Sequence, residues 1–260
     1  MIHSWRVLGL PWLHPHRGRG AGHRGPGQHG LSLSTLRPDT TTGRTGRHTL
    51  IYLYADYSHR VADDDRTGRI FLLRHGETEW SATGRHTGRA DIPLTDRGRE
   101  RARAAGRTLV ALRGEGPLAR TLTSPRIRAR DTANLAGLVP DAIDERLAEW
   151  DYGDYEGLTT PEIRRIDPGW TVWTHPCPGG ETAHQVASRA DDLLAEARTL
   201  LAGGDVVLVG HGHFSRVLIV RWIRQPVRAG VNVAMDAAAW SVLGHEGIEP
   251  RLDHINLSLP

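Results

Sequence analysis

Two histidines, each followed by glycine, stand at the ends of two apolar runs of the chain. Residues 70–76 read "IFLLRHG" and residues 206–212 read "VVLVGHG". Imidazole can act as a nucleophile near neutral pH, and glycine lets backbone amides approach a ligand closely. Arg74 adjoins His75, and Arg128 follows a third apolar run. These residue types together predict an anion-binding site.

The elements that must position these residues alternate along the chain between strands and helices. Continuous apolar strands between helices indicate an α/β fold with a mostly parallel sheet covered on both faces. Ligands bind beyond the carboxyl ends of such strands, so we expect the two histidines to meet at one rim. The patterns predict strands at 69–73, 118–124, 205–212, 238–246 and 252–257. They predict helices at 95–112, 125–138, 160–166, 182–202 and 213–224. Pro125 would occupy the first position of the second helix.

The first 60 residues differ in composition from the rest. Residues 1–60 are rich in Gly, Arg, His and Pro and lack a regular apolar period, so we expect a disordered extension, whereas residues 61–260 should fold as one domain. The extension carries eight arginines against two aspartates, so its net charge is +6 and that of residues 61–260 is −3. No nucleic-acid partner is therefore expected for the folded part. The G-x-G-x-x-G at 20–25 has no preceding strand and is interpreted as a chance match.

The remaining bulk properties favour a cytoplasmic protein that does not bind a membrane. Cys177 is the single cysteine, so an intramolecular disulfide is excluded, as suits a reducing compartment. No stretch is long and apolar enough to span a bilayer. The N-terminus also lacks the cleavage site of a signal peptide. The oligomeric state stays open, with a homodimer among the options.

Five motifs occur in an order that resembles the histidine phosphatase superfamily, the phosphoglycerate-mutase-like proteins. They are "LRHGETEW", "TSPRIRARDTA", "EWDYGDYEG", "PGGET" and "VGHGHFSR", within residues 69–224. In this family the chain is most similar to bacterial broad-range acid phosphatases and to fungal sedoheptulose-bisphosphatase-type members. The resemblance implies a three-layer α/β/α sandwich. It also implies a metal-independent phosphomonoesterase that acts through phosphohistidine on small phosphorylated metabolites, without a cofactor.

The resemblance further implies a role for individual residues. Guanidinium groups match phosphoryl oxygens in a bidentate way and stay charged at any working pH. With a protonated histidine they would supply the positive charge that many phosphotransferases take from magnesium. The implied catalytic set is His75 as nucleophile, Glu149 as proton donor with Asp151 as the nearest rival, and Arg74, Arg128 and protonated His211 as phosphate-binding groups.

Four further residues are candidate substrate contacts. Thr87 and Gly88 keep the family's local "TG" pattern, and Gly212 follows the second histidine. Ser81 stands where many relatives have asparagine, and its hydroxyl is the fourth candidate. Gly84 replaces another common asparagine and can contribute only backbone atoms.

Several alternatives stay open. A sugar bisphosphatase or a phosphoglycerate mutase would use the same chemistry, although the short stretch 158–178 contains only two basic residues, which disfavours a mutase. Trp170 and Trp173 in this stretch would form either an apolar rim around an open pocket or part of the core. His211 and His213 could be a metal pair, but no matching H-x-x-D-H cluster accompanies them, so no metal is expected. All five catalytic positions are present, which disfavours an inactive scaffold.

Overall fold

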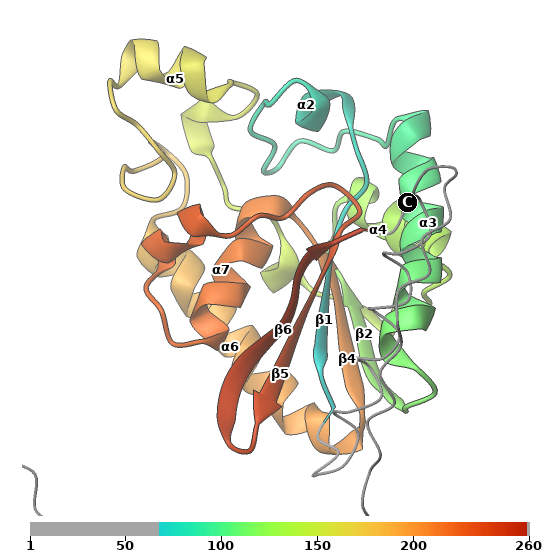
Figure 1. The fold of residues 1–260 in the computed structure, drawn as a ribbon. Helices are drawn as coiled ribbons and strands as arrows, with labels where there is room; N and C mark the ends of the chain where they lie inside the picture. Colours follow the sequence, from blue (N-terminus) through green and yellow to red (C-terminus); the bar gives the residue numbers. More distant parts are fainter. Residues whose placement is uncertain (1–67, 259–260) are drawn as a thin grey trace, which may run out of the picture. The chain divides into compact units, whose positions relative to one another are not determined.

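The computed structural model describes residues 68–258, and a six-stranded sheet runs through its centre (Figure 1). The predicted extension at residues 1–60 lies outside this part. Within residues 68–258, no helix is long and apolar enough to cross a membrane. The strand order is β3-β2-β4-β1-β5-β6. The strands are β1 (Ile70–Arg74), β2 (Leu118–Thr123), β3 (Ala142–Ile143), β4 (Asp205–Gly210), β5 (Trp240–Glu246) and β6 (Glu249–Leu257).

The sheet is mostly parallel, as the sequence predicts. Strand β1 pairs in parallel with β4, β4 with β2, and β2 with β3, whereas β5 and β6 complete the sheet in antiparallel pairs. The register between β1 and β4 places Arg74 opposite Gly210. The residues that follow these two positions are the two histidines, so both emerge at the same edge of the sheet.

Helices cover both faces of the sheet and complete a three-layer sandwich. Ile70 and Leu72 of β1 pack in the core beneath α6 and α7, whereas Phe71 and Leu73 pack beneath α3 and α4. This burial on both sides explains why the strand sequence is apolar without alternation. The helices are α2 (Glu79–Ala82), α3 (Asp96–Arg113), α4 (Ile127–Leu135), α5 (Thr160–Ile166), α6 (Ala183–Leu200) and α7 (Gly212–Trp222).

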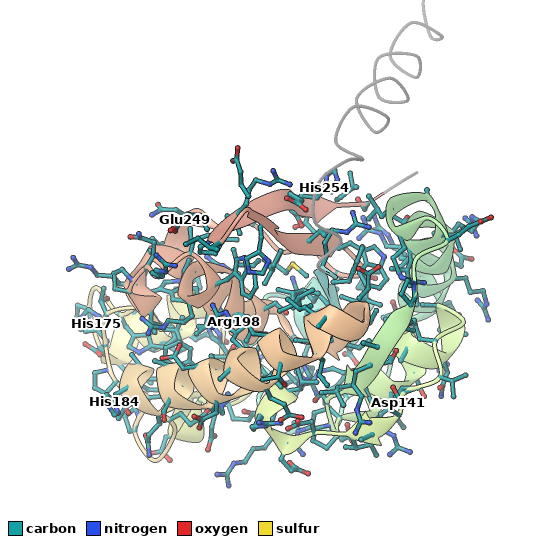
Figure 2. All side chains as sticks on the ribbon, turned by 90° about the horizontal axis from the view of Figure 1, so that it is seen from below. Asp141, His175, His184, Arg198, Glu249 and His254 are labelled. Atoms are coloured by element: carbon teal, nitrogen blue, oxygen red, sulfur yellow. The ribbon has the colours of Figure 1, made fainter. Side chains whose placement is uncertain are left out.

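Two helices lie at the rim rather than on a face of the sheet. Helices α2 and α5 lie beyond the carboxyl end of β1, at the top of Figure 1. An antiparallel bridge joins Arg85, in the loop after α2, to Thr159, the N-cap of α5. The long helix α6 instead lies across the sheet and turns a polar face outward, where His184 and Arg198 are exposed (Figure 2). Its predicted capping box, Thr182 with Gln185, is present.

Helix α4 is shorter than the sequence predicts. Pro125 does not occupy the first helical position, because Arg126 is still extended and serves as the N-cap. Asp91 receives the backbone N–H of Ile127 at 2.7 Å and so stabilises the first turn from another segment. At the other end, Gly137 adopts a φ of +75°, a left-handed conformation that ends the helix before residue 138.

A glycine pair packs the loop after β1 against the start of α3. A Cβ on Gly98 would lie 2.1 Å from the carbonyl oxygen of Glu77, and a Cβ on Gly76 would lie 2.5 Å from the carbonyl oxygen of Gly98. Both obstacles are backbone atoms, which cannot move aside as a flexible side chain can. The close approach therefore sets the position of the loop that follows His75.

Replacement of Gly98 by alanine should destabilise the protein, although alanine favours a helix. The clash should lower the free energy of unfolding by about 1–3 kcal/mol, as overpacking usually does. Gly116→Ala is the matched control, because its Cβ would meet no atom within 4 Å. Chemical denaturation of both variants measures the difference, and equal stabilities would contradict the packing argument.

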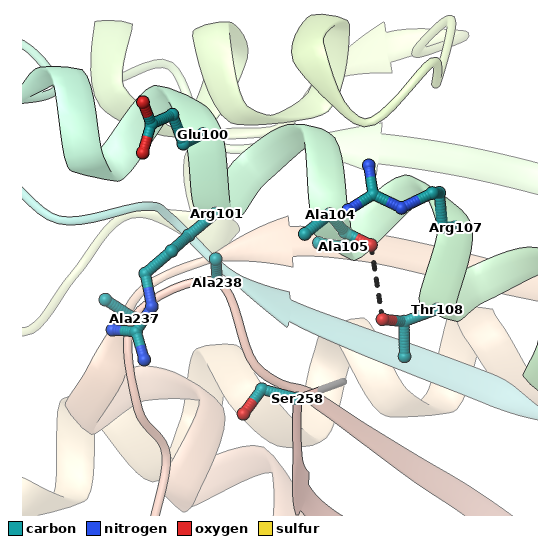
Figure 3. Close-up of a pocket in the computed structure, with 9 residues that line it drawn as sticks. All are labelled: Glu100, Arg101, Ala104, Ala105, Arg107, Thr108, Ala237, Ala238 and Ser258. Atoms are coloured by element: carbon teal, nitrogen blue, oxygen red, sulfur yellow. Dashed lines mark hydrogen bonds between the residues drawn. The ribbon is translucent and has the colours of Figure 1, made fainter. Parts of the chain in front are cut away.

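A surface pocket lies beside α3. Figure 3 shows α3 on one side of this pocket and Ala237 and Ala238 on the other, with Ser258 at its edge. Its floor is largely alanine, and Arg101 and Arg107 lie around it. No residue of the predicted catalytic set lines this pocket.

Candidate active site

The two histidines predicted to meet at the rim lie side by side. The rings of His75 and His211 are 5.2 Å apart between centroids, at an angle of 61°. The backbone N–H of His75 continues the strand pairing by donating to the carbonyl of Gly210 at 2.9 Å. Both imidazoles are buried, with exposed fractions of 4% and 0%. The parallel register of β1 and β4 thus brings together residues that are far apart in sequence.

Hydrogen bonding sets the tautomer of His75. Its Nδ1 lies 2.7 Å from the carbonyl oxygen of Gly76, which can only accept, so Nδ1 carries the hydrogen and Nε2 carries the lone pair. Burial lowers the pKa of His75 well below its usual range, and the charges of Arg128 and Arg74 lower it further. This imidazole is therefore neutral at the pH of ordinary assays, as a nucleophile must be.

His211 is held by a residue that the sequence analysis did not single out. Its Nε2 lies 2.7 Å from the hydroxyl of Ser124, which is fully buried at the end of β2. Its Nδ1 is buried without a hydrogen-bond partner among the described residues. Burial, followed by the charge of Arg128, lowers the pKa of His211 well below its usual range. The free site thus disfavours a charged His211, and the positive charge predicted for it beside a phosphoryl group stays a prediction.

The guanidinium groups of half-buried Arg74 and fully buried Arg128 flank the histidines. Arg74 donates from Nη1 to the carbonyl of Met235 at 2.6 Å. The Nε atoms of Arg74 and Arg128 are buried and have no hydrogen-bond partner among the described residues. Burial lowers the pKa of both groups, and the charge of Glu149 is the largest cause that opposes this lowering. Because arginine stays charged in proteins, the site combines positive charge with unused donors.

The loop at residues 87–90 aims the guanidinium of Arg128. Its Nη1 donates to the carbonyl of Ala90 at 2.7 Å, and Nη2 donates to the carbonyls of Thr87 and Gly88 at 2.9 and 3.2 Å. Thr87 and Gly88 therefore position Arg128 through their backbone. The predicted contact of either residue with substrate stays a prediction.

A carboxylate holds the opposite side of this loop. Glu156 accepts the backbone N–H groups of Gly88, Arg89 and Ala90 at 2.9 to 3.4 Å. A Cβ on Gly88 would lie 2.7 Å from the carbonyl oxygen of Trp150, so only glycine fits there. Glu156 lies in the motif "EWDYGDYEG", but its function depends on contacts with residues almost 70 positions away, which no local pattern indicates.

Glu149 lies at the N-terminus of α7, the helix that follows His211. Its carboxylate accepts the backbone N–H of Trp150 at 2.9 Å, of Phe214 at 2.8 Å and of His213 at 3.0 Å. The partial positive charge at a helix N-terminus favours a carboxylate there. The rival residue, Asp151, pairs with the exposed Arg89 at 2.7 Å instead.

Ser81 and Gly212, the other two predicted substrate contacts, each have a structural role, and their contact with substrate stays a prediction. Ser81 forms a capping box with Thr78: its hydroxyl accepts the Thr78 N–H at 2.9 Å, and the Thr78 hydroxyl accepts the Ser81 N–H at 3.1 Å. Gly212 lies against the guanidinium of Arg74, where a Cβ would be 3.2 Å from Cζ. Glycine at this position leaves room for the guanidinium beside the second histidine.

An imidazole and indole cluster packs beside the site. Trp170 and Trp173 are buried, with exposed fractions of 1% and 8%, so they form part of the core rather than an open rim. His213 stacks on His86 with centroids 5.8 Å apart, and its Nδ1 lies 2.6 Å from the hydroxyl of Tyr152. Across residues 68–258, no group of three or more His, Cys, Asp or Glu side chains could hold a metal ion.

Comparison with known proteins places the chain in a family. The model of the histidine phosphatase superfamily (branch 1) matches residues 70–258. The chain belongs to this superfamily. An acid phosphatase of Mycobacterium tuberculosis is 50% identical to this histidine phosphatase over 181 residues, which are 70% of this chain and 88% of the relative. A sedoheptulose 1,7-bisphosphatase of Saccharomyces cerevisiae is 32% identical over 183 residues, with 60% and 68% of the two chains covered.

Solved structures agree with this assignment. The product of an open reading frame of Mycobacterium tuberculosis matches with a TM-score of 0.72 at 47% identity, over 74% of this chain and 99% of that chain. A mycobacterial glucosyl-3-phosphoglycerate phosphatase complexed with VO3 matches with a TM-score of 0.64 at 34% identity, over 74% and 100%. The family and its phosphatase members support phosphatase activity, and hence hydrolase activity, for this chain.

The buried histidines should make this histidine phosphatase less stable at acidic pH. Burial lowers the pKa of His86 to about 4, so between pH 4 and 6.5 the unfolded chain binds the extra proton. Stability is therefore full above pH 6.5 and falls as the pH drops, by up to about 1.4 kcal/mol per pH unit for one histidine.

His86→Gln should reduce the dependence of the free energy of unfolding on pH by the contribution of one titrating histidine. Chemical denaturation at several pH values between 7.5 and 4.5 measures it, with exposed His184→Gln as the control. A slope unchanged by His86→Gln would show that this imidazole is not the group that titrates.

Proposed function

We propose that the protein is a metal-independent phosphomonoesterase that acts on small phosphorylated metabolites through a phosphohistidine intermediate. The observation that carries the proposal is the neutral His75 imidazole, whose Nδ1–H is bound by the Gly76 carbonyl. This hydrogen bond leaves the Nε2 lone pair available for attack beside the guanidinium groups of Arg74 and Arg128. A nucleophile with a set tautomer and adjacent positive charge is the arrangement that phosphoryl transfer requires.

In the first half of the reaction, His75 Nε2 attacks phosphorus and the ester oxygen leaves. Glu149 gives its proton to that oxygen, so an alcohol departs and a carboxylate remains. In the second half, Glu149 takes a proton from water, and the hydroxide oxygen attacks the phosphohistidine. Inorganic phosphate leaves, and His75 is neutral again.

Charge on the phosphoryl oxygens is matched by the guanidinium groups of Arg74 and Arg128. Their unpartnered Nε–H groups are suitable donors, as is His211 once it carries a hydrogen on Nδ1. Because the site is buried, these donors act in a low dielectric and stabilise negative charge more strongly than in water. A bound phosphate dianion also favours protonation of His211, which the free site disfavours.

The names of similar proteins support this proposal. An acid phosphatase is 50% identical, and one phosphatase of similar fold forms complexes with VO3 and with inorganic phosphate. A sugar bisphosphatase is the second candidate, because a sedoheptulose 1,7-bisphosphatase is also similar. A screen of phosphorylated metabolites with full kinetics separates the two, since a bisphosphatase should prefer esters that carry two phosphates.

His75→Ala should abolish turnover of p-nitrophenyl phosphate measured with EDTA present, because His211, the neighbouring imidazole, is bound at Nε2 by Ser124 and serves the proposed phosphate-binding role, so no equivalent in-line nucleophile remains. Rapid quenching of the active wild type should trap an acid-labile phosphohistidine. His184→Ala, an exposed histidine on α6, is the matched control and should keep full activity. Turnover by His75→Ala, without a trapped intermediate in the wild type, would refute the mechanism.

Glu149→Gln should slow the hydrolysis of alkyl phosphates more than that of p-nitrophenyl phosphate. General acid catalysis contributes about 10²–10⁴-fold, and the p-nitrophenolate leaving group hardly needs a proton. The glutamine keeps the shape of the side chain, and its oxygen can still accept the N–H groups of Trp150 and Phe214, whereas its NH2 group cannot accept that of His213. Comparison of kcat/KM for both substrates measures the effect. Equal losses would make Asp151 the next acid to test.

A further inference from the structure

We propose that Arg189, on the second turn of α6, is a positioning residue for the Glu149 carboxylate. The proposal rests on the function proposed above, in which Glu149 donates the proton to the leaving group. Arg189 reaches neither the nucleophile nor the phosphate-binding groups through its hydrogen bonds, and it acts through the backbone around Glu149.

All five N–H donors of the Arg189 guanidinium are used. Nε and Nη2 bind the two carboxylate oxygens of Glu181, each at 2.8 Å. Nη1 donates to the carbonyls of Arg146 and Ala148, both at 2.8 Å, and Nη2 also donates to the carbonyl of Glu149 at 3.2 Å. Three carbonyls of one short segment thus converge on one side chain, which only the planar fork of arginine can serve.

The Arg189 guanidinium also contacts Phe214, one of the residues whose backbone N–H binds the Glu149 carboxylate. Its Cζ lies 4.0 Å from the ring centroid of Phe214, within the range of a cation–π contact. The backbone N–H of Phe214 donates to Oε1 of Glu149 at 2.8 Å. Arg189 therefore contacts the main chain of Glu149 and also the residue that holds its side-chain oxygen.

Glu181, from the motif "PGGET", extends this support beyond Glu149. Its Oε2 accepts the backbone N–H of Asp151 at 3.0 Å, and its carbonyl accepts the indole N–H of Trp150 at 3.0 Å. The side chains of Arg189 and Glu181 are only 17% and 22% exposed, so water competes weakly for these bonds. The bidentate pair thus holds residues 146–151 on both sides of the acid.

Misplacement of the acid has a distinctive kinetic consequence. Proton transfer requires the donor within hydrogen-bond reach of the leaving oxygen, whereas attack by His75 and binding of phosphate do not involve Glu149. Loss of Arg189 should therefore reproduce the leaving-group dependence expected for Glu149→Gln. A merely destabilised fold would reduce the hydrolysis of every substrate by the same factor.

The test is kinetic and uses the full 260-residue chain with glycerol 2-phosphate and p-nitrophenyl phosphate. Arg189→Lys keeps the charge but cannot make the five bonds. It should lower kcat/KM for glycerol 2-phosphate by at least about 10-fold, part of the general-acid contribution, and by less than about 3-fold for p-nitrophenyl phosphate. In the Glu149→Gln variant, Arg189→Lys should lower kcat/KM for glycerol 2-phosphate little further, because the acid is already absent.

Arg221→Lys is the matched control. Arg221 makes an equivalent bidentate pair with Asp191, at 2.8 Å for both bonds, and also joins α6 to α7. It should change neither substrate's kcat/KM by more than about 2-fold, because rearrangement of this pair leaves the acid in place. Thermal unfolding of each variant identifies any that is unfolded at the assay temperature, and Glu181→Gln then replaces Arg189→Lys.

The outcomes separate this inference from the proposed function. A wild type that hydrolyses neither ester refutes the proposed function itself. An active wild type whose Arg189→Lys variant loses both activities equally, or keeps both, refutes the positioning role alone. The same selective loss in Arg221→Lys would also refute it, since any weakened contact between α6 and α7 would then suffice.

Discussion

The parallel register between β1 and β4 is the constraint on which the site depends. It places Arg74 opposite Gly210, and the next residue of each strand is a histidine. A shift of one residue would turn a histidine to the opposite face of the sheet. The register is in turn held by a strand buried on both faces, in which neighbouring side chains enter different cores. The chemistry thus depends on packing that is distributed over the whole domain.

Burial then determines the charge of each group. Taking an imidazole out of water disfavours its charged form, and two neighbouring guanidinium groups add to this effect. The pKa values of His75 and His211 are therefore both lowered well below their usual range. One consequence is a neutral nucleophile. The positive charge of the site therefore comes from the guanidinium groups of Arg74 and Arg128, which a bound anion would stabilise.

Sequence patterns predicted the fold and the central residues because their signals are local. Apolar runs gave β1 and β4, and the positions after them gave the histidines. Helix α4 was predicted too long: Gly137 ends it early, and its start at Ile127 is stabilised by Asp91, a partner from another segment that no local pattern indicates. Ser124, Glu156 and Arg189 were missed for the same reason. Their hydrogen bonds join residues about 40 to 90 positions apart, and periodicity carries no information about such contacts.

Arg128 and Glu156 are positioned through the loop between them rather than through a direct ion pair. Glu156 holds N–H groups of the loop at 88–90, and Arg128 binds carbonyls of the same loop. A direct ion pair between the two side chains would use guanidinium donors and neutralise the charge needed for an anion. Glu156 instead fixes the loop, and the loop fixes Arg128, so the charge of Arg128 stays available for an anion. Arg189 supports Glu149 in the same way, through backbone carbonyls of its segment and through the ring of Phe214, whose N–H binds the carboxylate.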